Sequence, residues 1–210
     1  MIELNKIYNE DCLETMKRME DKSVDLVLTD TPYGVNFEYN KYDDTPENLQ
    51  KLVNEFMPEV LRIGKRVLIT CGNGNQHLYP KPDWTLAWVI SAGAGQNKCG
   101  FTCWQPILFY GKDAYRGNNM GARPDIIQKI EITKENRHPC AKPLGFWQAL
   151  LLRESVKESD LIYDPFMGSG TTAVACVNLK RNYIGSEISK EYCKIAEQRI
   201  KNIEKQPSLI

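Results

Sequence analysis

The stretch DLIYDPFMGSGTTAVACVNLKRNYIGSE, residues 160–187, decides the fold. Its apolar run at 160–164 predicts a strand, the glycines after it predict a tight turn, and the small residues of 170–180 predict a helix. A second strand is predicted at 182–187. Such a unit implies two parallel strands with the helix packed on one face of the sheet. The turn presents backbone N–H groups at the start of the helix, which is typical of a nucleotide-cofactor site.

The rest of the chain continues the alternation of strands and helices. Further strands are predicted at 24–30, 66–70, 85–90 and 106–110, and further helices at 46–63, 143–157 and 189–204. This order predicts an α/β fold with a mostly parallel sheet and helices on both faces. The segment 91–137 fits least well, because its stretches rich in glycine and asparagine are typical of loops.

Length and composition indicate one domain without a membrane or secretion signal. A chain of 210 residues is long enough for one sizeable core. It contains no apolar run long enough for a bilayer, and its N-terminus is charged, so we expect a cytoplasmic protein. Residues 1–60 carry 14 acidic and six basic side chains, a net charge of −8, which leaves +8 on the rest because the whole chain is neutral. This asymmetry allows a polyanion to bind on one face.

The seven cysteines favour a reducing compartment. Their number is odd and they are scattered through apolar surroundings, which does not suit a disulfide framework. Cys99 and Cys103 form a close pair, but no second cysteine or histidine pair stands at a matching spacing. We therefore expect buried thiols and no metal site. The four tryptophans are also expected in the core.

The second informative stretch is DLVLTDTPYGVNF, residues 25–37. Its predicted strand ends in a tetrad made of Asp30, Thr31, Pro32 and Tyr33. Ligands of open parallel sheets bind beyond the carboxyl ends of strands, where the strand order reverses, so Asp30 and Asp164 would border one crevice. The Asp30 carboxylate and the Thr31 carbonyl can each accept an N–H, which suits an amino group, and Tyr33 offers a stacking face for a base. The simpler interpretation is that Asp30 caps a turn and Tyr33 is a core aromatic.

The glycine motif alone leaves the class of cofactor open. Residues 168–173 fit the loose dinucleotide pattern Gly-x-Gly-x-x-Gly/Ala, and Glu187 follows the next strand, where a carboxylate can bind ribose hydroxyls. No lysine follows the glycines, which argues against a phosphate-binding P-loop. A nicotinamide-dependent oxidoreductase is therefore one candidate.

Three motifs in a fixed order resemble the β-class S-adenosylmethionine-dependent DNA amino-methyltransferases. They are DTPY (30–33), HPCAKP (138–143) and DPFMGSGTT (164–172), against family motifs of Asp/Ser-Pro-Pro-Tyr, His-Pro-x-x-Lys-Pro and Phe-x-Gly-x-Gly. The resemblance is close over 4–37 and 138–200. It implies S-adenosylmethionine as cofactor, DNA as partner, a target base flipped out of the duplex, and direct methyl transfer to an exocyclic amino group.

The same resemblance assigns roles to individual residues. The catalytic residues would be Asp30, Thr31, Pro32 and Tyr33. The cofactor-binding residues would be Asp11, Cys12, His138, Lys142, Pro143, Asp164, Phe166, Gly168, Ser169, Gly170, Thr171, Thr172, Glu187 and Ile188. Asp11 is also predicted to cap a short helix, a role compatible with cofactor binding.

The implied architecture is a Rossmann-like methyltransferase fold. It has a seven-stranded, mostly parallel sheet with an antiparallel edge hairpin, for which 85–90 and 106–110 are the candidate strands. We expect one domain in three parts. Residues 1–90 would form a catalytic half, 91–137 a loop-rich insert for target recognition, and 138–210 a cofactor-binding half.

The tetrad differs from the family pattern at Thr31, where proline is usual. Threonine keeps the main-chain carbonyl but does not fix φ, so we expect modest activity that Thr31→Pro preserves or raises. A catalytically weak nucleic-acid-binding relative is the alternative that this departure suggests.

The first residue of the tetrad favours one target base over another but does not decide between them. Aspartate at the first tetrad position favours adenine N6, whereas serine is commoner among cytosine-N4 enzymes, and the two acceptors would serve either base. Single-stranded DNA and RNA stay open as substrates. The resemblance also suggests a homodimer and a restriction–modification setting.

Overall fold

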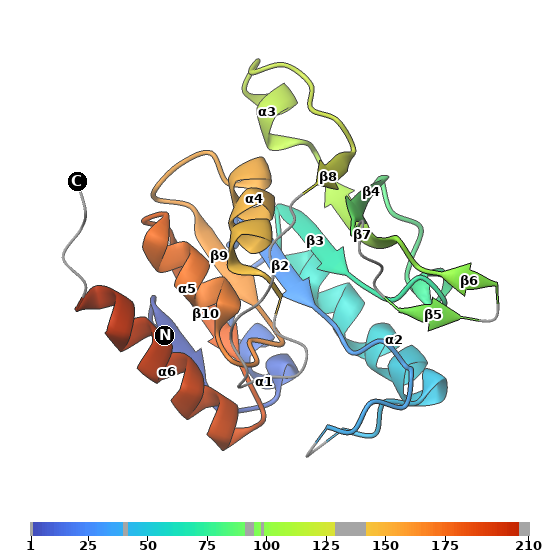
Figure 1. Ribbon diagram of the computed structural model, residues 1–210. Helices are drawn as coiled ribbons and strands as arrows, with labels where there is room; N and C mark the ends of the chain where they lie inside the picture. Colours follow the sequence, from blue (N-terminus) through green and yellow to red (C-terminus); the bar gives the residue numbers. More distant parts are fainter. Residues whose placement is uncertain (1, 40–41, 91–94, 98, 129–141, 206–210) are drawn as a thin grey trace.

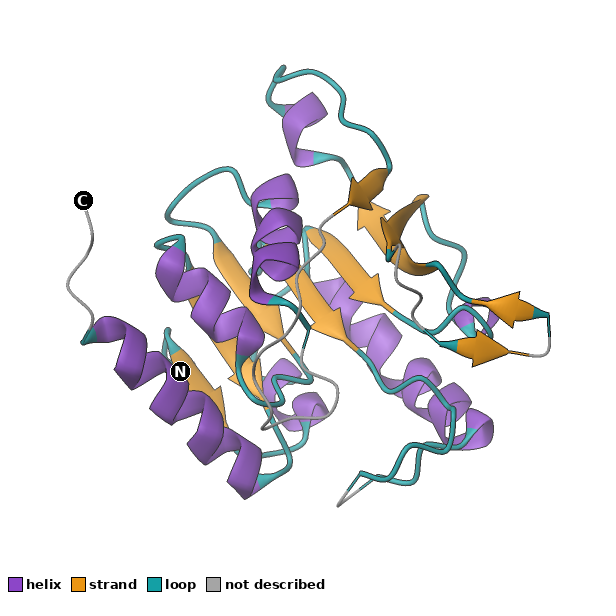
Figure 2. Cartoon of the chain, in the orientation of Figure 1, coloured by secondary structure: helices purple, strands orange, loops and turns teal. Residues whose placement is uncertain are grey.

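The computed structural model describes residues 2–39, 42–90, 95–97, 99–128 and 142–205. Its main sheet has eight strands in the order β1-β10-β9-β2-β3-β7-β4-β8 (Figures 1 and 2). Their bounds are β1 Lys6–Tyr8, β2 Leu26–Asp30, β3 Arg66–Thr70, β4 Trp84–Val89, β7 Trp104–Gly111, β8 Ile126–Gln128, β9 Leu161–Asp164 and β10 Asn182–Ser186. Within this sheet β7 alone runs antiparallel to its neighbours. A separate two-stranded hairpin pairs β5 (Gln96–Asn97) with β6 (Gly100–Phe101).

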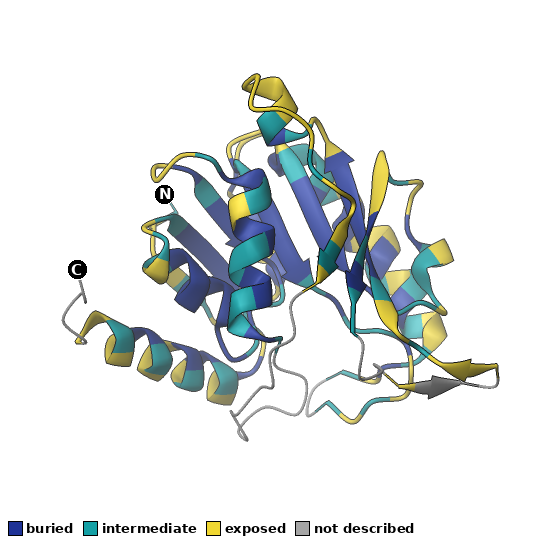
Figure 3. Ribbon diagram, turned by 45° about the horizontal axis from the view of Figure 1, so that its top comes forward, coloured by how far each residue is buried: buried dark blue, intermediate teal, exposed yellow. Residues whose placement is uncertain are grey.

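Helices cover both faces of the sheet. They are α1 Cys12–Met16, α2 Pro46–Ile63, α3 Ala114–Gly117, α4 Leu144–Glu154, α5 Thr171–Asn178 and α6 Lys190–Glu204, with a 3-10 turn at Gln76–Leu78. Side chains of α1 and α2 form one hydrophobic core with the sheet, and side chains of α4, α5 and α6 form the other. Figure 3 shows the central strands buried between these layers, while α6 and β6 are largely exposed.

Helix α2 shows how the sequence sets these elements. Thr45 caps it by accepting a hydrogen bond from the Asn48 N–H, and Pro46 occupies the first turn, where its missing N–H costs nothing. Buried side chains then recur at helical spacing, at Leu49, Val53, Phe56, Met57, Val60 and Ile63. The helix ends at Ile63, with Gly64 as its C-cap, and its predicted range of 46–63 is confirmed.

The strand order reverses between β2 and β9. These two strands pair in parallel, with Leu26 opposite Ile162 and Val27 opposite Tyr163. From β2 the chain passes through α2 to β3 on one side, and from β9 it passes through α5 to β10 on the other. The carboxyl ends of both strands therefore border one crevice, as the sequence predicts.

The strand count and the edge of the sheet differ from the prediction. The antiparallel pairing of β4 with β7 is confirmed, but β8 continues the sheet beyond β4, so the sheet has eight strands instead of seven. Strand β8 and the β5–β6 hairpin both lie in 91–137, which the sequence predicts as loop. Strands of two or three residues are too short to produce a periodic signal, and the same reason explains why β1 was not predicted.

Two expectations about burial are wrong. Trp88 and Trp147 lie in the core, but Trp84 and Trp104 are 58% and 39% exposed. The close pair Cys99 and Cys103 is exposed, although four other cysteines of the described chain are buried free thiols, namely Cys12, Cys71, Cys176 and Cys193. No helix in the described ranges is both long and apolar enough to cross a membrane.

Candidate active site

A cleft lies at the carboxyl ends of β2 and β9. Thirteen of the predicted site residues line it: Asp11, Cys12, Asp30, Pro32, Lys142, Asp164, Phe166, Gly168, Ser169, Thr171, Thr172, Glu187 and Ile188. The tetrad and the glycine motif, which are far apart in the sequence, therefore share one site. If the tetrad binds the amino group of a base and the glycine motif binds a cofactor, as the sequence predicts, a shared cleft brings the two ligands within reach of one another.

The other predicted residues support the cleft or lie outside the described residues. Thr31 is the buried member of the tetrad, and the Tyr33 hydroxyl donates a hydrogen bond to Asp30. Gly170 precedes α5, and Pro143 precedes α4 and is buried. His138 lies outside the described residues.

The glycine turn between β9 and α5 depends on backbone conformations that favour glycine. Gly168 and Gly170 have φ of 53° and 87°, in the left-handed region. A Cβ on Gly170 would also lie 2.6 Å from the Cβ of Ala196 on α6. The turn can therefore pack against α6 only because position 170 has no side chain, and this packing leaves the N-terminus of α5 facing the cleft.

Glu187 ties this turn to the end of β10. Its Oε2 accepts a hydrogen bond from the Gly168 N–H at 2.8 Å, and its Oε1 accepts one from the Ser189 N–H at 2.7 Å. The carboxylate therefore holds the glycine turn to the segment that follows β10 while it lines the cleft. Asp11 also has two roles. Its carboxylate caps α1 by accepting a hydrogen bond from the Leu13 N–H, and the residue lines the cleft.

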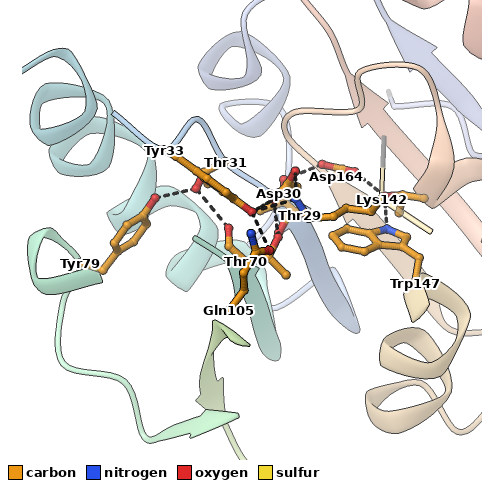
Figure 4. Close-up of polar contacts among 11 residues, drawn as sticks. Thr29, Asp30, Thr31, Tyr33, Thr70, Tyr79, Gln105, Lys142, Trp147 and Asp164 are labelled. Carbon is orange, nitrogen blue, oxygen red and sulfur yellow. Dashed lines mark hydrogen bonds and ion pairs between the residues drawn. The ribbon is translucent and has the colours of Figure 1, made fainter. Parts of the chain in front are cut away.

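Asp164 acts as an internal anchor. Its Oδ1 accepts hydrogen bonds from Thr29 Oγ1 at 2.6 Å and from the Phe166 N–H at 3.0 Å, and the Thr172 hydroxyl donates to Oδ2. The Trp147 indole on α4 donates in turn to Thr172 (Figure 4). Burial raises the pKa of Asp164 to about 6, because desolvation outweighs these neutral donors. The carboxylate thus joins β2, the turn and α5 at the base of the cleft.

The tetrad carries a network around the Asp30 carboxylate (Figure 4). Oδ1 accepts from the Thr70 hydroxyl at 2.5 Å and from the Tyr33 hydroxyl at 2.9 Å, and Oδ2 accepts from Lys142 Nζ at 2.7 Å. Lys142 also donates to the Tyr33 hydroxyl at 2.8 Å. Burial, and then the charge of Asp30, raise the pKa of Tyr33, so its phenol keeps its proton. Gln105 on β7 offers that proton a second acceptor at 3.3 Å.

Lys142 lies at the tetrad and at the cofactor cleft at once. The resemblance assigns it to the start of the helix beside the cofactor, and it does line the cleft next to α4. Its ammonium group, however, is directed at Asp30 and Tyr33, and the side chain is only 11% exposed. The sequence alone did not indicate this ion pair, because it joins residues from distant segments.

Eight lining residues are not among the predicted ones. They are Tyr39, Tyr42, Leu52, Trp147, Pro165, Met167, Ser189 and Tyr192. Tyr39 and Tyr42 follow the tetrad closely, in the aromatic segment FEYNKY, which was the available signal. On the other side, Phe56 of α2 packs edge-to-face against Phe166, with ring centroids 5.3 Å apart, and so supports the turn from below.

Comparisons with known proteins agree with this geometry. A family described as DNA methylase, of the N6/N4 type, matches residues 102–198. The type II methyltransferase M2.DpnII of Streptococcus pneumoniae is 37% identical, over 92% of this chain and 88% of the relative. The chain belongs to the N6/N4 DNA methylase family.

Solved structures show that this N6/N4 DNA methylase has the predicted Rossmann-like fold. The M1.HpyAVI–SAM complex superposes with a TM-score of 0.65 at 23% identity, over 93% of this chain and 98% of that one. The PvuII DNA methyltransferase, described as cytosine-N4-specific, gives 0.70 at 15% identity, over 98% and 87%. At these identities the likeness concerns the fold.

Replacing Gly170 by alanine is expected to destabilise the methylase. The left-handed φ and the contact with Ala196 together predict a loss of about 3 kcal/mol in the free energy of unfolding. Urea denaturation would measure it. Gly74→Ala is the matched control, because a Cβ there would meet no atom within 4 Å. Equal stability of the two variants would contradict the packing argument.

Asp164 predicts a specific pH dependence of stability. Its pKa rises from 3.8 to about 6 on folding, so the folded protein holds the proton more tightly, and the free energy of unfolding falls as pH rises through that interval. The expected loss is about 3 kcal/mol. In Asp164→Asn this fall should disappear, since the amide does not titrate and can donate to the Thr172 hydroxyl. An unchanged slope in Asp164→Asn, measured by urea unfolding at several pH values, would refute the assignment.

Proposed function

We propose that the protein transfers a methyl group from S-adenosylmethionine to the exocyclic amino group of a DNA base flipped out of the duplex, with adenine N6 as the target. The observation that carries the proposal is that the Asp30 carboxylate lines the same cleft as the glycine turn before α5. Membership of the N6/N4 DNA methylase family supports amino-methylation of DNA. The similar fold of the M1.HpyAVI–SAM complex supports S-adenosylmethionine as the cofactor.

The chemistry follows from the acceptors at the tetrad. An exocyclic amine is a weak nucleophile because its lone pair is delocalised into the ring. Asp30 Oδ2 and the Thr31 carbonyl can each accept one amino N–H, which favours a pyramidal nitrogen with a localised lone pair. S-adenosylmethionine supplies an electrophilic methyl group on a sulfonium. The new N–C bond forms as the C–S bond breaks, the electron pair of the broken bond stays on sulfur, and the nitrogen releases one proton, which passes to water. None of the cysteines is needed as a nucleophile.

The cleft residues fit this cofactor. Glu187 is assigned to the ribose hydroxyls, and Asp11 with Cys12 to the adenine. The segment from Phe166 to Thr172 is assigned to the methionine portion, where the N-terminus of α5 favours its carboxylate. Lys142 and Pro143 close this side at the start of α4, with His138 before them in the sequence.

The segment 91–137 is assigned to target recognition. Strand β7 begins at Trp104, which is 39% exposed, and continues with Gln105, whose side chain reaches the Tyr33 hydroxyl. The preceding β6 carries Phe101, which is 75% exposed. Exposed aromatic side chains on β6 and at the start of β7 suit contacts with unstacked bases. The homodimer suggested by the resemblance stays a prediction.

The direct test is methyl incorporation. Purified protein with labelled S-adenosylmethionine should methylate DNA, and Asp30→Ala should lower incorporation by about a thousandfold or more while S-adenosylhomocysteine still binds. Nucleoside mass spectrometry should detect N6-methyldeoxyadenosine. N4-methyldeoxycytidine instead would change the base but not the reaction.

Parallel substrates and cofactors separate the alternatives. Duplex DNA, single-stranded DNA and RNA should be compared, with duplex DNA preferred. Calorimetry should show binding of S-adenosylhomocysteine and none of NAD, which separates a methylase from an oxidoreductase. Cofactor binding without incorporation on any substrate would identify a weak nucleic-acid-binding relative and end the enzyme proposal.

Lys142→Met separates the two roles open to this lysine. The variant loses the charge-assisted bonds that hold Asp30 and Tyr33, so kcat should fall by about tenfold. The affinity for S-adenosylhomocysteine should change by less than about twofold. Lys201→Met, on the exposed face of α6, is the control. A large loss of cofactor affinity with unchanged kcat would instead assign Lys142 to the cofactor.

A further inference from the structure

Thr31 is held by hydrogen bonds to two other segments of the chain. Its hydroxyl lies 2.6 Å from the Tyr79 hydroxyl and 3.3 Å from the Thr70 carbonyl oxygen, and its N–H donates to the same carbonyl at 3.4 Å. Thr31 is 2% exposed and Tyr79 is 6% exposed. The residue that departs from the family pattern is therefore buried and hydrogen-bonded, so its backbone has restraints other than a proline ring.

The direction of these hydrogen bonds can be assigned. A threonine hydroxyl has one proton, and the Thr70 carbonyl can only accept. If Thr31 donates to Thr70, then Tyr79 must donate to Thr31. Burial raises the pKa of Tyr79 far above its ordinary value, so the phenol keeps the proton that this arrangement requires. The chain of donation runs from Tyr79 through Thr31 to Thr70.

Thr70 connects this chain to the reacting group. Its carbonyl receives both bonds from Thr31, and its hydroxyl donates to Asp30 Oδ1 (Figure 4). The first two residues of the tetrad are thus fixed to one residue at the end of β3. Thr70 therefore positions both acceptors proposed for the amino group, the Asp30 carboxylate and the Thr31 carbonyl, relative to one another.

We propose that Tyr79 is a positioning residue for the tetrad, and that the Tyr79–Thr31–Thr70 chain fixes the Thr31 carbonyl at the position where the family pattern has a proline. This inference rests on the proposed function. Tyr79 touches no reacting atom and acts only through Thr31.

The proposal reverses the expectation for Thr31→Pro. Proline at this position removes the N–H and the hydroxyl that bond to Thr70, and it leaves the buried Tyr79 hydroxyl without its acceptor. A buried polar group without a partner costs about 1–3 kcal/mol. Proline therefore fits this chain only if the tyrosine hydroxyl is removed as well.

The test is a set of variants at both positions, assayed for kcat and for the KM of each substrate. Tyr79→Phe and Thr31→Val should each lower kcat about tenfold, with the cofactor KM changed less than about twofold. The double variant should be no worse than either single variant, because both remove the same chain. Thr31→Ser keeps the hydroxyl and should keep kcat within about twofold. Thr31→Pro should lower kcat, and adding Tyr79→Phe should restore part of it.

Tyr110→Phe is the matched control. Tyr110 is also 6% exposed and packs in the same hydrophobic core as Tyr79, but its hydroxyl donates to the Pro80 carbonyl at 2.8 Å. The Tyr110→Phe variant should lose as much unfolding free energy as Tyr79→Phe but keep the kcat of the wild type. Equal kcat in the wild type and Tyr79→Phe, or equal losses in Tyr79→Phe and Tyr110→Phe, would overturn the proposal.

A second measurement does not depend on methyl transfer. Carbonyl-carbon relaxation dispersion at Thr31, recorded without DNA, should show microsecond-to-millisecond exchange in Tyr79→Phe but not in the wild type or Tyr110→Phe. If the wild type transfers no methyl group, the proposed function fails and this measurement alone decides the positioning role. Identical dispersion in all three proteins would refute that role.

Discussion

Strands β2 and β9 pair in parallel where the chain changes direction across the sheet, so Asp30 and Asp164 leave the sheet at the same edge. Side chains alternate between the faces of a strand, and a slip of one residue would send every side chain of one strand to the opposite face. The bond from Thr29 to Asp164 spans this pair of strands at its carboxyl end and is satisfied only in the observed register. The cleft, the turn and the tetrad all depend on that register.

The two aspartates are in different electrostatic surroundings. Asp164 is buried among neutral hydroxyl and amide donors, which is why its pKa lies near 6. Asp30 is more exposed and faces the ammonium of Lys142, a full opposite charge. Among the described residues, each carboxylate accepts two hydrogen bonds at Oδ1 and one at Oδ2. Burial and the charge of the partner therefore separate the framework carboxylate from the one proposed to act on substrate.

The sequence was most informative where the signal is local or follows the topology of the fold. The range of α2 follows from its cap and its apolar spacing, and the meeting of Asp30 with the glycine turn follows from the rule that ligands bind where the strand order reverses. Strand β8 has only three residues and gives no periodic signal, so the sequence did not predict that this strand forms the edge of the sheet. The bonds of Lys142 to Asp30 and Tyr33 were not predictable either, because they depend on how α4 approaches β2.

Thr31 shows why a departure from a motif cannot be judged from the motif alone. Proline restricts φ through a covalent ring that acts in the folded and unfolded chain alike. The hydrogen bonds that join Thr31 to Tyr79 and to Thr70 can hold the same backbone only in the folded chain, because Tyr79 follows the 3-10 turn and Thr70 ends β3. The restriction is then a property of the tertiary structure, and no local pattern in the sequence records it. A threonine that looked like a loss of order in the sequence becomes, in the folded protein, the residue through which Tyr79 acts on the tetrad.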